Sequence, residues 1–228
     1  MVPWGEIGTV LLDMDGTLLD LHFDTHFWLE HVPRRYAEAR GLDVPTAKAE
    51  LYPRLSRIQG TMHWYCLDYW SNELDLDIAG LKREVEHLIA THPHVREFLG
   101  AVRQRGHRVV LVTNAHARSL ELKMERTGLG AHFDALICAH DIGIPKEDPG
   151  FWPRLQRREP FDTAHGLLVD DDPAVLRSAR TYGIAHLLAV RRPDSQAPPR
   201  EVCEFPAIES FRDLLPPERS DAASRSPA

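Results

Sequence analysis

Two aspartates separated by one residue follow a short apolar run near the start of the chain. Residues 10–12 are Val-Leu-Leu, and Asp13, Asp15, Gly16 and Thr17 come next. Such a run is typical of a buried parallel strand, and ligands gather at the carboxyl ends of these strands. Two neighbouring carboxylates repel each other unless a cation lies between them, and Mg²⁺ prefers oxygen ligands. The segment therefore predicts a Mg²⁺ site, where Gly16 turns the backbone beside the ligand; a solvated acidic turn is the alternative.

Three consecutive aspartates follow a second apolar run, at residues 167–169. These are Asp170, Asp171 and Asp172, and Pro173 comes after them. Three carboxylates at the end of one strand indicate a bound cation more strongly than they indicate a helix cap. Asp172, directly before proline, is also well suited to cap a helix. We therefore expect Asp170 and Asp171 to belong to the metal site.

A hydroxyl and an ammonium group complete the set of candidate site residues. Thr113 and Asn114 follow the apolar run 109–112, where the threonine hydroxyl and the next backbone amides could bind a phosphoryl oxygen. A helix cap is the simpler interpretation of this pair. Lys146 stands in a loop before Pro149. It could present a point charge to a phosphate and keep a carboxylate ionised, although most loop lysines are solvated.

In this order and spacing, the four segments resemble the four motifs of the haloacid dehalogenase superfamily of Mg²⁺-dependent phosphohydrolases, which begin with DxDGT. The resemblance implies that Asp13 is the nucleophile and that Asp15 is the general acid and base. It further implies that Thr113 and Lys146 hold the phosphoryl group. An aspartate at position 15 suits a leaving alkoxide that must be protonated. A phosphomonoesterase or a phosphomutase is therefore expected, rather than a dehalogenase or an ATPase.

The resemblance also implies a Mg²⁺ site formed by Asp13, the carbonyl group of Asp15, and Asp170. Asp171 would either bind the metal directly or contact the residues that do. One departure from the family pattern is Glu147, where many relatives have proline after the lysine. This difference changes the loop but leaves the charge of Lys146.

The pattern of the remaining chain predicts an α/β fold, a Rossmann-like doubly wound parallel sheet with an inserted helical cap. Apolar runs typical of strands alternate with helical periodicity, at residues 7–12, 108–112, 135–138, 166–169 and 184–190. Residues 21–91 contain only helical patterns, at 27–40, 45–58, 63–70 and 81–89. We expect a catalytic core of residues 1–20 and 92–215 and a cap of residues 21–91. The polar segment 216–228 is expected to be disordered.

The predicted cap holds seven of the ten Trp and Tyr residues of the chain. Most of these rings could simply pack the helical bundle, but some, with Trp64 and Trp70 as candidates, could stack on a nucleobase. The segments LLDMDGTLLDLHFD, WYCLDYW, TNAH and PKED resemble the GMP/IMP nucleotidase branch of the superfamily. This implies a purine nucleoside 5′-monophosphate as substrate. A generalist or sugar-phosphate phosphatase and a β-phosphoglucomutase-like mutase remain alternatives.

Two other interpretations are weaker. A response-regulator receiver also combines acidic residues, threonine and lysine, but in another order and without a seventy-residue insertion. His22 and His26 lie four residues apart and could form a metal pair, but no third ligand is near in the sequence, so a helix surface is favoured.

Composition excludes several classes of protein. The net charge of −7 argues against a nucleic-acid partner, because such proteins carry a basic surface. Three scattered cysteines without CxxC spacing predict neither a disulfide framework nor a zinc site. No signal peptide pattern or long apolar run is present. We therefore expect a cytoplasmic monomer or weak dimer that acts on a small phosphomonoester away from membranes.

Overall fold

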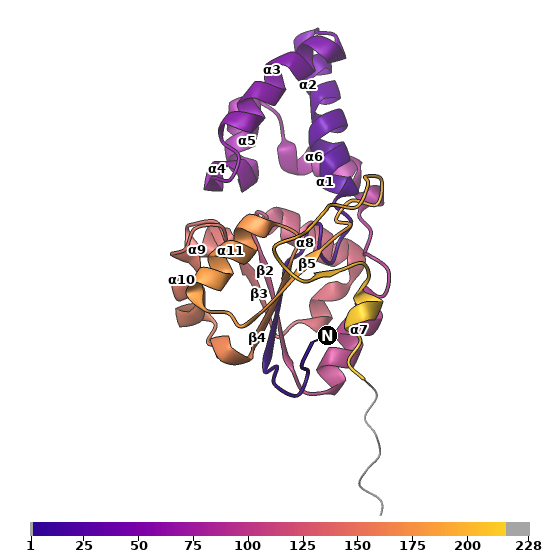
Figure 1. Ribbon diagram of the computed structural model, residues 1–228. Coiled ribbons are helices and arrows are strands. Elements are labelled where there is room, and N and C mark those ends of the chain that lie inside the picture. Colours follow the sequence, from indigo (N-terminus) through magenta and orange to yellow (C-terminus); the bar gives the residue numbers. More distant parts are fainter. Residues whose placement is uncertain (1, 218–228) are drawn as a thin grey trace, which may run out of the picture.

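The computed structural model describes residues 2–217, which form a parallel sheet flanked by helices and a separate group of helices beside it (Figure 1). Within this range, six strands form one sheet in the order β3-β2-β1-β4-β5-β6, and every neighbouring pair is parallel. The strands are β1 (Thr9–Leu12), β2 (Arg108–Thr113), β3 (Ala135–Cys138), β4 (Gly166–Asp170), β5 (His186–Val190) and β6 (Ala207–Ile208). Because β1 lies between β2 and β4, the predicted metal-site aspartates leave adjacent strands.

Helices cover both faces of the sheet. On one face Val10 and Leu12 of β1 pack with α7 and α8, and on the other Leu11 packs with α10 and α11. The helices within residues 92–217 are α7 (Val95–Gln104), α8 (Ala117–Thr127), α9 (Ala139–Ile142), α10 (Phe151–Arg158) and α11 (Pro173–Tyr182), with short 3₁₀ turns η3 (Leu129–His132), η4 (Thr163–His165) and η5 (Phe211–Leu214). Burial on both faces explains why the strands are continuous apolar runs. The expected doubly wound parallel sheet is confirmed.

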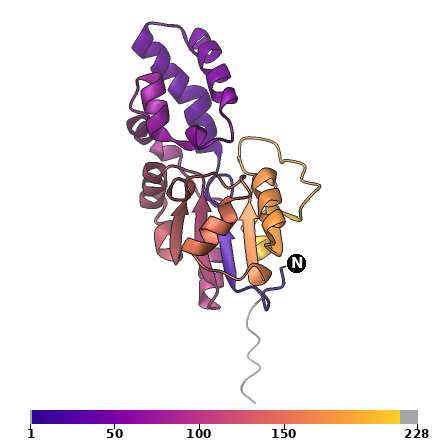
Figure 2. The same ribbon diagram turned by 90° about the vertical axis from the view of Figure 1, so that its left-hand side faces the viewer.

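The helical module (residues 22–88) lies beyond one end of the sheet (Figures 1 and 2). Its elements are α1 (His22–His26), the π-helical turn η1 (Phe27–His31), α2 (Val32–Arg40), α3 (Val44–Arg57), α4 (Met62–Tyr65), α5 (Leu67–Leu74), α6 (Ile78–Glu84) and η2 (Glu86–Leu88). α2 and α3 form a hairpin (Figure 2), in which Gly41 ends the first helix and the Asp43 side chain caps the second. The assignment of residues 1–20 with 92–215 to a core and of 21–91 to a cap stays a prediction.

Two expectations about single elements were wrong. The expected helix 63–70 is interrupted at Cys66, whose extended backbone separates α4 from α5 and whose Sγ accepts a hydrogen bond from the Tyr69 amide. The expected helix 81–89 breaks at Val85 into α6 and η2. Apolar periodicity continues through both breaks, so the pattern alone could not reveal them. The two-residue strand β6 was not expected, because it is too short to produce an apolar run.

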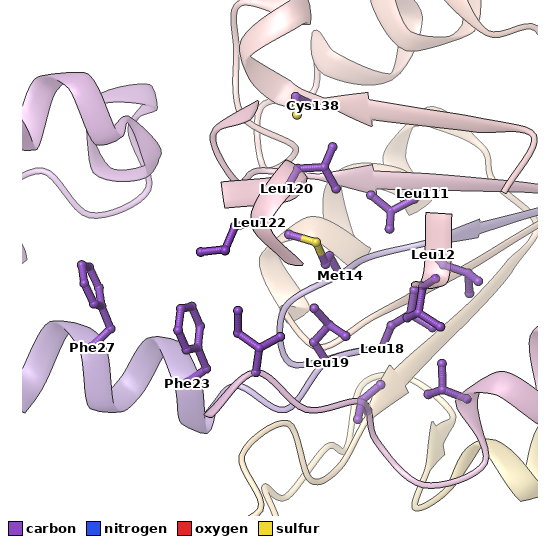
Figure 3. Packing of buried hydrophobic residues seen from close by; sticks show 14 of the residues in the cluster. Leu12, Met14, Leu18, Leu19, Phe23, Phe27, Leu111, Leu120, Leu122 and Cys138 are labelled. Carbon is purple, nitrogen blue, oxygen red and sulfur yellow. The ribbon is translucent and has the colours of Figure 1, made fainter. Parts of the chain in front are cut away.

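Buried apolar residues anchor the loop between β1 and α1. Met14, Leu18 and Leu19 are almost completely buried, and Figure 3 shows them between the sheet and Phe23 of α1. This packing fixes the segment that carries Asp13 and Asp15, on either side of Met14.

The helices of residues 2–217 are all too short or too polar to cross a membrane. Apart from residues 216 and 217, the predicted tail 216–228 lies outside the described residues.

Candidate active site

A cleft of about 740 Å³ lies between the carboxyl ends of the strands and the helical module. This volume falls in the range of small-molecule sites, roughly 300–1,000 Å³. All of the predicted site residues except Gly16 line it, namely Asp13, Asp15, Thr113, Asn114, Lys146, Asp170 and Asp171. The module contributes aromatic and other side chains to the opposite wall, including Trp28, Tyr52, Trp64 and Tyr65. The four sequence segments therefore meet in one place.

Lys146 joins the aspartates of two adjacent strands. Its Nζ lies 2.5 Å from Oδ1 of Asp13 and 2.6 Å from Oδ2 of Asp170, and its side chain is only 2% exposed. Burial raises the pKa of each carboxyl group to about 7, against the opposing effect of the lysine. The two aspartates raise the pKa of Lys146 although burial alone would lower it. The lysine therefore stays protonated and offsets part of the negative charge of the two carboxylates.

Asp171 completes a group of three acidic residues, which we call the carboxylate cluster (Asp13, Asp170 and Asp171). One oxygen from each carboxylate lies within 4.8 Å of the others. The pKa of Asp171 is raised to about 7 by burial and by the nearby Asp13, while Arg200, 3.1 Å away, opposes the increase. Buried carboxylates that repel one another, with oxygen as the only donor type, match what Mg²⁺ requires.

Gly16 makes room for this cluster. Its φ of +82° lies in the left-handed region that favours glycine. A Cβ atom at this position would also lie 2.7 Å from the Asp171 carboxylate. The glycine of the first motif is therefore required by both the turn and the approach of Asp171, whereas its predicted contact with substrate stays a prediction.

The carboxylate of Asp15 belongs to a different group, which sequence reasoning missed. Nζ of Lys123, from α8, lies 2.6 Å from Asp15 Oδ1 and 2.6 Å from Asp24 Oδ2. Nζ of Lys82 lies 2.7 Å from the other Asp24 oxygen. We call these four residues the charge network; both lysines are almost fully buried. It ties the loop after β1 to α8 of the core and to α1 and α6 of the helical module.

Ion pairing gives the two aspartates of the charge network different acidities. Burial tends to raise the pKa of Asp24, but Lys123 and Lys82 outweigh it and lower the pKa to about 2. For Asp15, burial dominates and the pKa is raised. A signal for Lys123 was present in the sequence, because it stands near Leu120 and Met124 on the apolar stripe of a helix that ends at Gly128.

Asn114 and Glu147 connect three segments at the edge of the cleft. Asn114 Oδ1 accepts the backbone N–H of Lys146 at 2.9 Å, and its Nδ2 donates to Glu147 at 2.8 Å. The Tyr65 hydroxyl of the helical module donates to the other Glu147 oxygen at 2.5 Å. The Thr113 hydroxyl accepts the Ala115 amide at 3.0 Å. The residue that departs from the family pattern, Glu147, therefore links the core to the helical module.

The aromatic residues of the helical module divide into two groups. Trp64 lines the cleft, whereas Trp70 is 1% exposed and packs against Trp28 and Trp64. Of the two tryptophans considered from the sequence, only Trp64 is placed to touch a ligand. His22 lies 3.9 Å from Asp194, and neither it nor His26 joins a group of three potential metal ligands in the described part of the chain.

The sequence matches the model of the haloacid dehalogenase-like hydrolase family over residues 7–183. This chain belongs to that family. The hydrolase is 37% identical over 215 residues to the GMP/IMP nucleotidase YrfG of Escherichia coli. The matched residues cover 94% of this chain and 97% of the relative. Together, the family and this relative support a phosphatase.

Solved structures show the same fold for the hydrolase. A HAD phosphatase from Thermococcus onnurineus superposes with a TM-score of 0.77 at 20% identity, covering 91% of this chain and 96% of that one. A putative β-phosphoglucomutase from Thermotoga maritima gives a TM-score of 0.65 at 18% identity, with 92% and 97% covered. The helical module of the hydrolase is thus part of a shared architecture.

Proposed function

We propose that the hydrolase is a Mg²⁺-dependent phosphomonoesterase that acts on purine nucleoside 5′-monophosphates through a phosphorylated Asp13. The observation that carries the proposal is the position of Asp13, which contacts Lys146 and lies beside the other two acidic residues of the carboxylate cluster, at the floor of a cleft with an aromatic wall. The similarity to a GMP/IMP nucleotidase over nearly the whole chain supports the substrate class.

In the proposed first step, a carboxylate oxygen of Asp13 attacks phosphorus and the bond to the ester oxygen breaks. Asp15 gives its proton to the leaving oxygen, which departs as an alcohol. The raised pKa of Asp15 favours the protonated form that this step requires. Lys146 and the Thr113 hydroxyl hold the phosphoryl oxygens. The positive charge of the lysine and the dipole of the hydroxyl stabilise the negative charge that develops on these oxygens.

In the second step, water attacks the phosphorus of the acyl phosphate. Asp15, now ionised, takes the proton from this water, and the bond between phosphorus and the Asp13 oxygen breaks to release inorganic phosphate. The carboxylate cluster would hold Mg²⁺, which when bound supplies further neutralisation of phosphate charge. Dividing one difficult displacement into two easier ones is the general advantage of a covalent intermediate.

Residues 21–91 act in this proposal as a cap that selects the substrate. The phosphate site is confined to the core, so the nucleoside must extend toward the helical module. Trp64 and Tyr52 are placed on that side of the cleft, where a ring could stack on a base. Contacts remote from phosphorus increase kcat/KM when they help to close the cap over the reacting group.

Phosphate release from GMP, IMP, UMP and glucose 6-phosphate, with Mg²⁺ or with excess EDTA, tests this function. We expect the highest kcat/KM for GMP and IMP, and no activity in EDTA. Asp13→Asn provides the background and should form no acid-labile phosphoenzyme. Full activity in EDTA would exclude the metal-dependent scheme. Equal kcat/KM for all four substrates would indicate a generalist phosphatase, and isomerised product without phosphate a mutase.

A further inference from the structure

A second group of potential metal ligands lies at the contact between the helical module and the core. One potential ligand atom from each of Cys66, His116 and His140 lies within 4.8 Å of the others. Cys66 stands between α4 and α5, His116 precedes α8, and His140 is in α9. Figure 1 shows α4 at the edge of the module that faces α9. These three residues, the Cys–His–His cluster, are separate from the carboxylate cluster.

His140 has unused binding capacity. Both of its ring nitrogens are buried, and neither has a hydrogen-bond partner among residues 2–217. Buried polar atoms are normally paired, so each orphan requires an explanation. The ring instead meets His116 edge-to-face, with centroids 5.0 Å apart. Burial lowers the pKa of both histidines, and a neutral imidazole is the form that binds metals.

The other two residues of the cluster are held by weak contacts that a metal could replace or use. The Cys66 sulfur accepts the Tyr69 amide at 3.4 Å. Nδ1 of His116 accepts the Arg118 amide at 3.3 Å, and its Nε2 lies 3.5 Å from an Asp68 oxygen. A carboxylate at the second ring nitrogen commonly orients a metal-binding histidine.

We propose that the Cys–His–His cluster binds Zn²⁺ and thereby fastens the helical module to the core. One sulfur and two imidazole nitrogens suit Zn²⁺ and disfavour Mg²⁺, which prefers oxygen. Binding releases the Cys66 thiol proton and leaves a fourth position for water. Because Cys66 belongs to the module and both histidines belong to the core, bound Zn²⁺ opposes any separation of the two parts. Zn²⁺ therefore slows each catalytic cycle that requires the cleft to open.

Zinc titration of the full chain in saturating Mg²⁺, against a chromogenic chelator, tests the site without reference to catalysis. We expect one Zn²⁺ per chain in the wild type and in Cys203→Ser, a matched control with an exposed cysteine. Cys66→Ser and His140→Gln should weaken binding by more than the roughly 10- to 100-fold typical of residues that merely support a ligand. Co²⁺ in place of Zn²⁺ should give a thiolate charge-transfer absorption that Cys66→Ser lacks.

Unchanged Zn²⁺ affinity in both variants would overturn the proposal, as would an absence of thiolate absorption in the wild type. Displacement of Zn²⁺ by Mg²⁺ would place the ion at the carboxylate cluster instead. Inhibition of phosphate release is a separate readout that rests on the proposed function. Zn²⁺ should inhibit the wild type and Cys203→Ser but not Cys66→Ser, and equal inhibition of all three would exclude the fastening of the module.

Discussion

Replacing Lys123 by methionine tests whether the charge network holds the helical module to the core. The substitution keeps most of the side-chain volume but removes the ammonium group that lies 2.6 Å from both Asp15 and Asp24. Lys82 then remains as the only cation of the network, facing two partly buried carboxylates. Breaking a buried ion pair by removing one partner typically costs about 3–5 kcal/mol.

The same magnitude follows from protonation. At pH 7 the charge network of the variant becomes neutral only if one of its carboxyl groups takes up a proton. The ordinary pKa of such a group is near 3.9, about three units below pH 7. At 1.36 kcal/mol per unit, this costs up to about 4 kcal/mol relative to the unfolded chain. The wild type already bears part of this cost, because the pKa of Asp15 is raised there too. Because the folded variant then binds more protons than the unfolded chain, its stability increases as the pH falls. The difference from wild type should therefore shrink by up to roughly 1.4 kcal/mol per unit between pH 7 and pH 5.

Urea denaturation at fixed Mg²⁺ and at several pH values measures this difference. Lys48→Met is the matched control, because Lys48 pairs with Glu30 at 2.7 Å on the surface, where such pairs contribute about 0–1 kcal/mol. Adding Asp24→Asn to Lys123→Met should recover much of the loss, since the network is again neutral. A loss below about 1 kcal/mol for Lys123→Met, or one that does not depend on pH, would refute the reasoning.

The other predictions concern the cleft. Trp64→Ala should lower kcat/KM for GMP about 5- to 150-fold, from the roughly 1–3 kcal/mol of a base stack, and hardly affect p-nitrophenyl phosphate. Trp70→Ala should instead destabilise the fold by about 3–5 kcal/mol. A lower melting temperature for Trp64→Ala, together with a selective loss of kcat/KM for GMP in Trp70→Ala, would contradict the assignment of Trp64 to substrate binding and of Trp70 to packing. Tyr65→Phe and Glu147→Gln should each lower kcat/KM for GMP about tenfold or more, because a hydrogen bond to a charged group contributes roughly 1.5–3 kcal/mol. The double variant should be no worse than the single ones, and fully additive losses would show that the two residues act separately. Mg²⁺ should raise the melting temperature more at pH 8 than at pH 5. The three carboxyl groups of the carboxylate cluster have pKa values raised to about 7, so they lose protons as the pH rises, and the fold without metal loses stability. The ionised carboxylates are also the form that binds Mg²⁺. A larger effect of Mg²⁺ at pH 5 would contradict this.

Much of the fold could be predicted because its signals are local. A strand buried on both faces must be a continuous apolar run, so β1, β2 and β4 were visible without any tertiary information. The order of strands and helices then required a parallel sheet, whose carboxyl ends share one edge. Asp13 and Asp170 therefore had to come close together, and the structure places both against Lys146.

The sequence by itself determined which residues form the floor of the cleft, and the tertiary structure decided what they touch from the helical module. Lys123 and Asp15 are 108 residues apart, and Tyr65 and Glu147 are 82 apart. Such pairs depend on how two packed units meet, which no periodicity within either unit encodes. The Cys–His–His cluster is the clearest case, because its residues have no metal-site spacing in the chain. The break at Cys66 and the packing of the module against the core bring their ligand atoms to within 4.8 Å.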